Sequence, residues 1–184
     1  MEGAVENYCR AIEIDANSEN ACFNLGRVLF NTGEYKGASE IFLRIIEIDP
    51  KCEQSYCNLG RALCKTGDME GGIESYRKAV ELDPNYKEAF FKLGDALSEI
   101  EDFKGAIENY LRAIKIDPGY FDACYNLGAA FYKKGDCEGA IGLFCKAVKL
   151  DPSSKDAYFN IGAILSTTED IKHAIECLCK AIDI

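Results

Sequence analysis

Residues 55–84 show the spacing of apolar residues that two consecutive amphipathic helices require. Apolar and small side chains recur three or four residues apart on both sides of a Gly67-Asp68 turn, which is the period of one helix face. Pro84 follows the second run and cannot continue a helix, so the pattern ends there. The residues that carry the pattern are Tyr56, Leu59, Gly60 and Leu63 before the turn, and Gly72, Tyr76, Ala79 and Val80 after it.

The same pattern returns along the whole chain in steps of 34 residues. A Leu-Gly or Ile-Gly pair marks each first run, and an Asp-Pro pair follows four of the second runs. Such a period without insertions predicts a stack of helical hairpins, each of which needs its neighbours to bury its apolar face. The glycines of the pairs are Gly26, Gly60, Gly94, Gly128 and Gly162, and the chain's prolines are Pro50, Pro84, Pro118 and Pro152.

The repeat predicts one domain over residues 1–184, with no linker or low-complexity tract. Residues 1–15 match only the second helix of a partial repeat, and five repeats follow at 19–52, 53–86, 87–120, 121–154 and 155–184. We expect first helices at 19–32, 53–66, 87–100, 121–134 and 155–168. We expect second helices at 35–48, 69–82, 103–116, 137–150 and 171–183.

These positions, in phase with one another, resemble the tetratricopeptide repeat (TPR) family, whose pattern is Trp-x2-Leu-Gly-x2-Tyr, Ala-x3-Phe and Pro. The Trp position holds Cys22, Tyr56, Phe90, Cys124 and Tyr158. The Ala position holds Ala4, Ala38, Gly72, Ala106, Ala140 and Ala174, and the Phe position holds Tyr8, Phe42, Tyr76, Tyr110, Phe144 and Leu178. The chain departs from the pattern in having no Trp, and in placing Glu101 and Glu169 where other turns have glycine. The resemblance implies an all-α fold, a right-handed superhelical solenoid of helix–turn–helix repeats.

The composition is that of an ordinary globular protein, with 48% hydrophobic and 28% charged residues. No apolar run approaches the ~20 residues that a membrane span needs, and the N-terminus does not read as a signal peptide. A net charge of −10 argues against a nucleic-acid groove, which needs clustered Lys and Arg. We therefore expect a cytoplasmic protein with no membrane span and no nucleic-acid partner.

Ten cysteines raise the question of disulfides or a metal site. Most fall at packing positions of the repeat, where free cysteine acts as a small buried hydrophobe, so we expect reduced structural thiols. A zinc site is the alternative, but there is no Cys-x2-Cys pair and His173 is the one histidine. We expect no metal and no cofactor, and we expect Cys57 and Cys64, at groove positions, to react first with thiol reagents.

Catalytic machinery is not evident. There is no phosphate-binding glycine loop and no nucleophile–base set that could include His173, so we expect a non-enzyme. Acidic pairs such as Glu101-Asp102 and Glu169-Asp170 fall where second helices begin, and acids are favoured there as helix caps.

The family resemblance places the first helices on the inside of the superhelix, in a groove where partner proteins lie. A chaperone-tail carboxylate clamp is disfavoured because Glu88 brings the wrong charge. The repeats are more similar to those of the O-GlcNAc transferase superhelix, where successive asparagines hold the backbone of an extended peptide. The expected groove residues are Phe23, Asn24, Arg27, Asn58, Arg61, Phe91, Lys92, Tyr125, Asn126, Phe159 and Asn160.

Charge is expected to give this groove a direction. Basic residues come first along the chain, and acidic residues follow in the middle repeats. The alternative to a ligand role is that Asn is simply common at this consensus position. The basic residues are Arg27, Arg61 and Lys65, and the acidic ones are Glu88, Asp95, Glu99 and Asp122.

The sequence thus favours a non-catalytic interaction scaffold or adaptor that binds a protein or extended peptide. One alternative is a self-assembling scaffold, in which the unpaired second helix at residues 1–15 joins copies end to end as a homo-oligomer. Another is the substrate-recruiting region of a larger enzyme.

Overall fold

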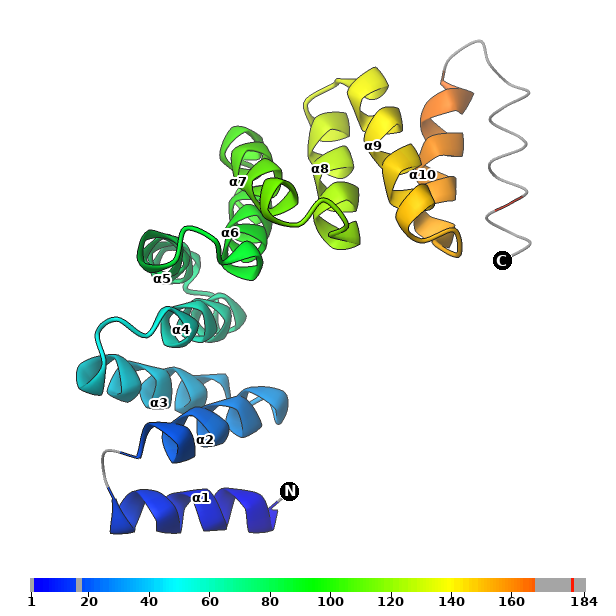
Figure 1. Cartoon of the computed structure of the whole chain (residues 1–184). Coiled ribbons are helices and arrows are strands. Elements are labelled where there is room, and N and C mark those ends of the chain that lie inside the picture. The colour runs from blue at the N-terminus through cyan, green and yellow to red at the C-terminus, as the bar shows by residue number, and fades with distance from the viewer. Residues whose placement is uncertain (1, 16–17, 168–179, 181–184) are drawn as a thin grey trace. The chain divides into compact units, whose positions relative to one another are not determined.

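The computed structural model describes residues 2–15, 18–167 and 180 (Figure 1). These residues form ten α-helices and no β-strand. Apart from residue 180, the helix expected at 171–183 lies outside the described residues, together with Glu169, Asp170 and His173. The helices are α1 (Glu2–Ile14), α2 (Glu19–Asn31), α3 (Tyr35–Ile48), α4 (Glu53–Thr66), α5 (Met69–Leu82), α6 (Lys87–Glu99), α7 (Phe103–Ile116), α8 (Phe121–Lys133), α9 (Cys137–Leu150) and α10 (Lys155–Ser166).

The predicted helix boundaries agree with the structure. Four second helices, α3, α5, α7 and α9, span the predicted residues without a shift. The first helices α2, α6, α8 and α10 end one or two residues earlier than predicted, a difference that is ordinary at helix ends.

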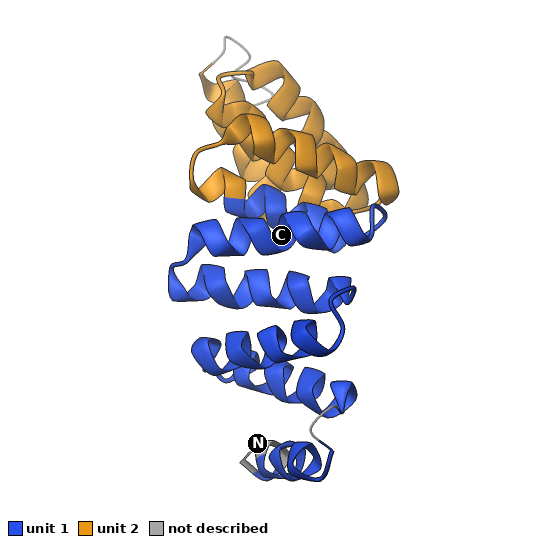
Figure 2. Ribbon diagram, turned by 90° about the vertical axis from the view of Figure 1, so that its left-hand side faces the viewer, with its two compact units in different colours: residues 1–96 blue, residues 97–184 orange. Residues whose placement is uncertain are grey.

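Two compact units divide the chain, residues 1–96 and residues 97–184 (Figure 2). In unit 1, the helices α1, α2, α3, α4 and α5 pack on one another in sequence, and most of α6 belongs to the same unit. In unit 2, α7, α8, α9 and α10 pack in the same sequential way. This neighbour-to-neighbour packing is that of an all-α solenoid. That residues 1–184 form one domain stays a prediction.

Three described hairpins, α2–α3, α4–α5 and α8–α9, close through a glycine beneath an aromatic ring. A Cβ built at Gly60 would lie 2.8 Å from Tyr76 Cε1 and 2.9 Å from the carbonyl oxygen of Gly72. A Cβ at Gly26 would lie 2.9 Å from the ring of Phe42. Both rings are buried. Because a side chain at the glycine would separate the two helices, the Leu-Gly pairs are a packing requirement.

Gly72 shows how one repeat adjusts this contact. It stands where the other described repeats have alanine, and a Cβ there would collide with Cys64 Sγ. The thiol therefore occupies the volume that an alanine methyl fills in the other hairpins. Cys64 lies against α5, so its side chain is committed to packing.

The turn inside each hairpin needs a left-handed residue. Gly33, Gly67 and Gly135 have φ of 87°, 91° and 85°. Glu101 takes the same place with φ of 63°, which costs a residue with a side chain about 1–2 kcal/mol. The glutamate that stands at this turn in place of glycine therefore strains the backbone locally. The other such glutamate, Glu169, lies outside the described residues.

Aspartates cap the second helices that follow these turns. Asp68, Asp102 and Asp136 each accept a hydrogen bond from the backbone N–H three residues later, at 2.9, 2.9 and 2.8 Å. This satisfies one of the free donors at a helix start. The interpretation of Asp102 as a helix cap is confirmed.

The aspartate of each Asp-Pro pair shapes the connection between repeats. Its Oδ1 accepts the backbone N–H two residues later, at 2.8–3.0 Å in all four cases. Proline ends the helix, and the aspartate closes the turn that follows. The sequence predicted only the role of the proline. The four acceptors are Asp49, Asp83, Asp117 and Asp151.

Gly60→Ala tests the hairpin contact. Its methyl group would overlap Tyr76 and the backbone of α5, so we expect a loss of about 1–3 kcal/mol in unfolding free energy. Gly142→Ala is the matched control, because Gly142 is exposed in α9 with nothing within 4 Å of a built Cβ. There the higher helix propensity of alanine should add about 0.5–1 kcal/mol. Equal effects in denaturant titrations would contradict the assigned contact.

Glu101→Gly tests the strained turn. Glycine adopts positive φ without a Cβ penalty, so we expect a gain of about 1 kcal/mol in unfolding free energy, visible as a higher Tm. The same substitution at the exposed helical residue Glu108 should instead cost about 1 kcal/mol. If both variants lose stability, the strain at Glu101 is not significant.

Candidate peptide-binding surfaces

The four asparagines expected to face a ligand all lie on first helices and are all half-buried. Asn24 and Asn58 belong to unit 1, on α2 and α4. Asn126 and Asn160 belong to unit 2, on α8 and α10. The structure therefore offers two candidate surfaces, one in each unit.

In unit 1, Asn58 is already engaged within its own helix. Its Nδ2 donates to the carbonyl oxygen of Gln54 at 2.9 Å, and its Oδ1 accepts from Arg61 NH1 at 3.2 Å. An amide carries two donor hydrogens and two acceptor lone pairs, so one of each is left for a ligand. Asn58 thus orients the Arg61 side chain and still has one donor and one acceptor for a ligand.

In unit 2, Asn160 connects the two first helices. Its Nδ2 donates to the Tyr125 hydroxyl at 2.8 Å, from α10 to α8. The Tyr125 ring packs against Phe121 and Phe144 at centroid distances of 6.1 and 5.4 Å. Burial raises the pKa of Tyr125, and the hydrogen bond from Asn160 opposes that effect. The sequence held a signal for this pair, because an aromatic and an amide at adjacent repeat positions meet in neighbouring repeats.

The expected aromatic contacts divide into three kinds. Phe91 is only 6% exposed and its ring belongs to the core, so it offers a partner little surface, and its role in a groove stays a prediction. Phe23 is half-buried and meets Phe42 edge-on at 6.1 Å. Phe159 is 57% exposed and is the aromatic residue of this set most available to a partner.

Charged residues of unit 1 differ in how they are paired. Lys92 Nζ lies 3.0 Å from Asp95 Oδ2 and 4.5 Å from the centroid of the Phe91 ring. Arg61 lies over the Phe30 ring of α2, with its guanidinium carbon 4.6 Å from the centroid. Arg27 is exposed on α2. Lys92 is therefore neutralised within the protein, whereas the two arginines are not held by an acid.

The placement of Cys57 and Cys64 argues against the expectation that they react first with thiol reagents. Cys57 is 1% exposed, because its position turns into the core of unit 1, and Cys64 fills the space beside Gly72. Burial, with a smaller contribution from the Glu88 carboxylate, raises the pKa of Cys57 from 9.0 to about 11. Of the described cysteines, all of them free, Cys9 and Cys145 are the exposed ones, and Cys177 and Cys179 lie outside the described residues.

Comparison with protein families then settles the family. A model described as TPR repeat matches residues 60–100, 94–135 and 130–168, and two models described as tetratricopeptide repeat match residues 1–63 and 155–184. The chain belongs to the tetratricopeptide repeat family. No match was found among curated proteins.

Several solved TPR structures are similar to this chain. A crystal structure of MamA has 28% sequence identity and a TM-score of 0.82, covering 86% of this chain and 93% of MamA. MamA from Desulfovibrio magneticus RS-1 has 23% identity and a TM-score of 0.82, covering 90% of this chain and 93% of that one. YrrB, described as a TPR protein with an unusual peptide-binding site, has 23% identity and a TM-score of 0.79, covering 97% and 92%. The latter two support the fold alone.

The TPR fold makes this chain an interaction scaffold in its general architecture. None of the helices in residues 2–15 and 18–167 has the length and apolar character to cross a membrane.

Thiol labelling tests the assignment of buried and exposed cysteines. With iodoacetamide at pH 8, Cys9 and Cys145 should react first, as read by peptide mass spectrometry. Cys57 should react far more slowly than these two, because a pKa of about 11 leaves roughly a hundredfold less thiolate than the ordinary value of 9.0. Denaturant should equalise the rates. Early labelling of Cys57 in the folded protein would contradict its placement in the core.

Proposed function

We propose that this chain is a non-catalytic scaffold or adaptor that binds an extended peptide segment along its first helices. The observation that carries the proposal is the half-buried amide at one repeat position of α2, α4, α8 and α10. An amide can pair with a peptide group of either polarity, so amides at a regular spacing suit a peptide backbone. The family supports a protein or peptide partner, and no catalytic role is assigned to any residue. The proposed location is the cytoplasm.

Unit 2 is the better place to look for the amide contacts. Asn160 already donates to Tyr125 across the gap between repeats, so its amide lies where a bound chain would meet both helices. The exposed Phe159 ring is the preceding residue and can contact an apolar side chain at small entropy cost. Selectivity there would come from apolar contact rather than charge.

The double substitution Asn126→Ala with Asn160→Ala tests this proposal. Each lost hydrogen bond should cost about 0.5–1.5 kcal/mol, which together weaken binding about five- to a hundredfold. The probe is a set of peptides without Asp or Glu, selected on the full chain from a random display library, with affinity measured by fluorescence anisotropy.

Asn109→Ala is the matched control. Asn109 lies on the second helix α7, and its amide donates to the carbonyl oxygen of Gly105 at 2.8 Å. It should leave peptide affinity unchanged. If the double variant keeps its Tm and binds as tightly as the original, the asparagines are consensus residues without a ligand role.

A second candidate is end-to-end association of copies through α1. Ile14 is 84% exposed, more than its equivalents, of which Ile48, Leu82 and Ile116 are partly buried and Leu150 is 40% exposed. The neighbouring exposed residues Asn7 and Arg10 make the described part of this face more polar than expected. Sedimentation at increasing concentration tests the idea, because Ile14→Ser should then reduce the mass. A recruiting role within a larger enzyme is a third proposal, and the full open reading frame would decide it.

A further inference from the structure

Arg61 is held in a fixed place between two repeats of unit 1. Its guanidinium carbon lies 4.6 Å from the Phe30 centroid on α2, and its NH1 donates to Asn58 at 3.2 Å on α4. Phe30 is itself fixed, because its ring meets Tyr35 at a centroid distance of 5.3 Å. A stacked, hydrogen-bonded guanidinium loses little further freedom when it binds an anion.

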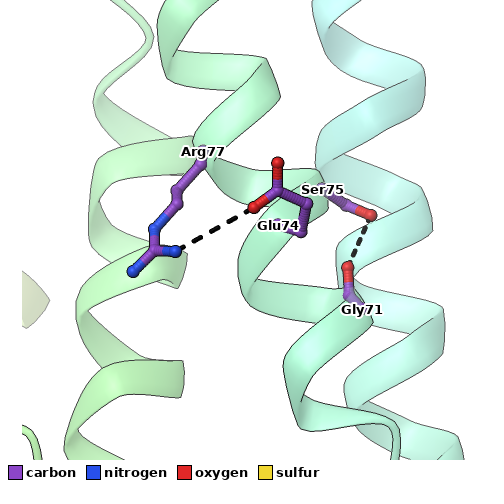
Figure 3. Close-up of polar contacts among 4 residues, drawn as sticks. All are labelled: Gly71, Glu74, Ser75 and Arg77. Atoms are coloured by element: carbon purple, nitrogen blue, oxygen red, sulfur yellow. Dashed lines mark hydrogen bonds and ion pairs between the residues drawn. The ribbon is translucent and has the colours of Figure 1, made fainter.

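The charge of Arg61 is not balanced by the protein. No carboxylate oxygen of the described residues lies within 4.0 Å of Arg61 or of Arg27. By contrast, Arg77 on α5 lies 3.9 Å from Glu74, on an exposed surface (Figure 3). Arg61 is thus held by an aromatic ring and an amide, and not by an acid. The fork of its guanidinium can therefore bind a carboxylate of a ligand.

Arg27 adds a second cation to the same surface. It occupies on α2 the repeat position that Arg61 occupies on α4, and it precedes Phe30 by one helical turn. Residues three apart share a helix face, so Arg27 lies on the same face of α2 as Phe30, over which Arg61 reaches. Lys65, exposed one turn after Arg61, extends the positive charge, in a protein whose net charge is −10.

We infer that Arg27 and Arg61 form a site in unit 1 for an acidic side chain of the bound peptide, with Asn58 as a positioning residue. The inference rests on the proposed function and names the chemistry of its ligand. A competing acid on the next first helix is Glu88, which is exposed and not paired with either arginine within 4.0 Å. It would limit the acidic stretch to α2 and α4.

Unit 2 lacks the means to bind an acid at the same repeat position. The equivalents of Arg27 and Arg61 are Ala129 and Ala163, both half-buried. The two units therefore differ in chemistry on a common helical frame. A peptide that binds unit 1 should need Asp or Glu, and a peptide that binds unit 2 should not.

The test starts from a random peptide library displayed against the full chain and against the variant Arg27→Gln with Arg61→Gln. The original chain should enrich peptides carrying Asp or Glu at a fixed position, and the variant should lose that enrichment. A selected acidic peptide should bind the original chain about ten- to a hundredfold more tightly than its Glu→Gln counterpart. The double variant should bind the two peptides equally, and raising the salt concentration should reduce the preference.

Two further variants keep the result interpretable. Arg77→Gln removes an exposed arginine of the same unit and should leave the preference intact, while Arg61→Glu should shift it toward Lys. If Arg61→Gln lowers the Tm, Arg27→Gln and Arg61→Lys replace it, and each should lose part of the preference. Peptides selected without acidic enrichment would overturn this inference alone. Selection of no peptide at all would overturn the proposed function with it.

Discussion

The close approach of the two helices in the hairpins α2–α3, α4–α5 and α8–α9 is the constraint on which the remaining structure depends. Gly26 and Gly60 allow it, because each lies beneath an aromatic ring from the second helix. The ring is buried by that contact and in turn supports the next hairpin. The hairpins repeat at a constant period along the sequence. Within each unit, residues at the same repeat position of successive first helices therefore lie on the same kind of surface.

That regularity explains what the sequence could predict. The period of glycine and proline predicted the ends of the helices to within two residues. The family was indicated by the residue types at repeat positions such as those of Phe42 and Ala38. Side-chain placement did not follow so directly. Cys57 and Phe91 share a repeat position with the exposed Phe159, yet both are buried, because the neighbours of that position differ from repeat to repeat. Periodicity identifies a helix face, but packing against the next repeat decides which side chains on its edge stay exposed.

A single sequence also could not predict how side chains at neighbouring positions compensate for one another in one repeat. Cys64 and Gly72 share the volume that an alanine methyl fills elsewhere, and neither residue alone indicates this. Asn58 and Asn160 have the same repeat position but different partners, Arg61 in one unit and Tyr125 in the other. The asparagines are thus a common polar frame, and the residues they contact give each surface its chemistry. A scaffold built in this way can change its ligand by substitutions that leave the helical frame intact.

The central claim is that ligands bind on the first helices, and nuclear magnetic resonance of the isotopically labelled full chain tests it most directly. A selected acidic peptide would be titrated while backbone amide and asparagine side-chain signals are followed. The account predicts shifts along α2 and α4, including the Asn58 amide and the Arg61 guanidinium, with the Asn109 amide on α7 unchanged. Shifts confined to the second helices α3 and α5 would contradict it.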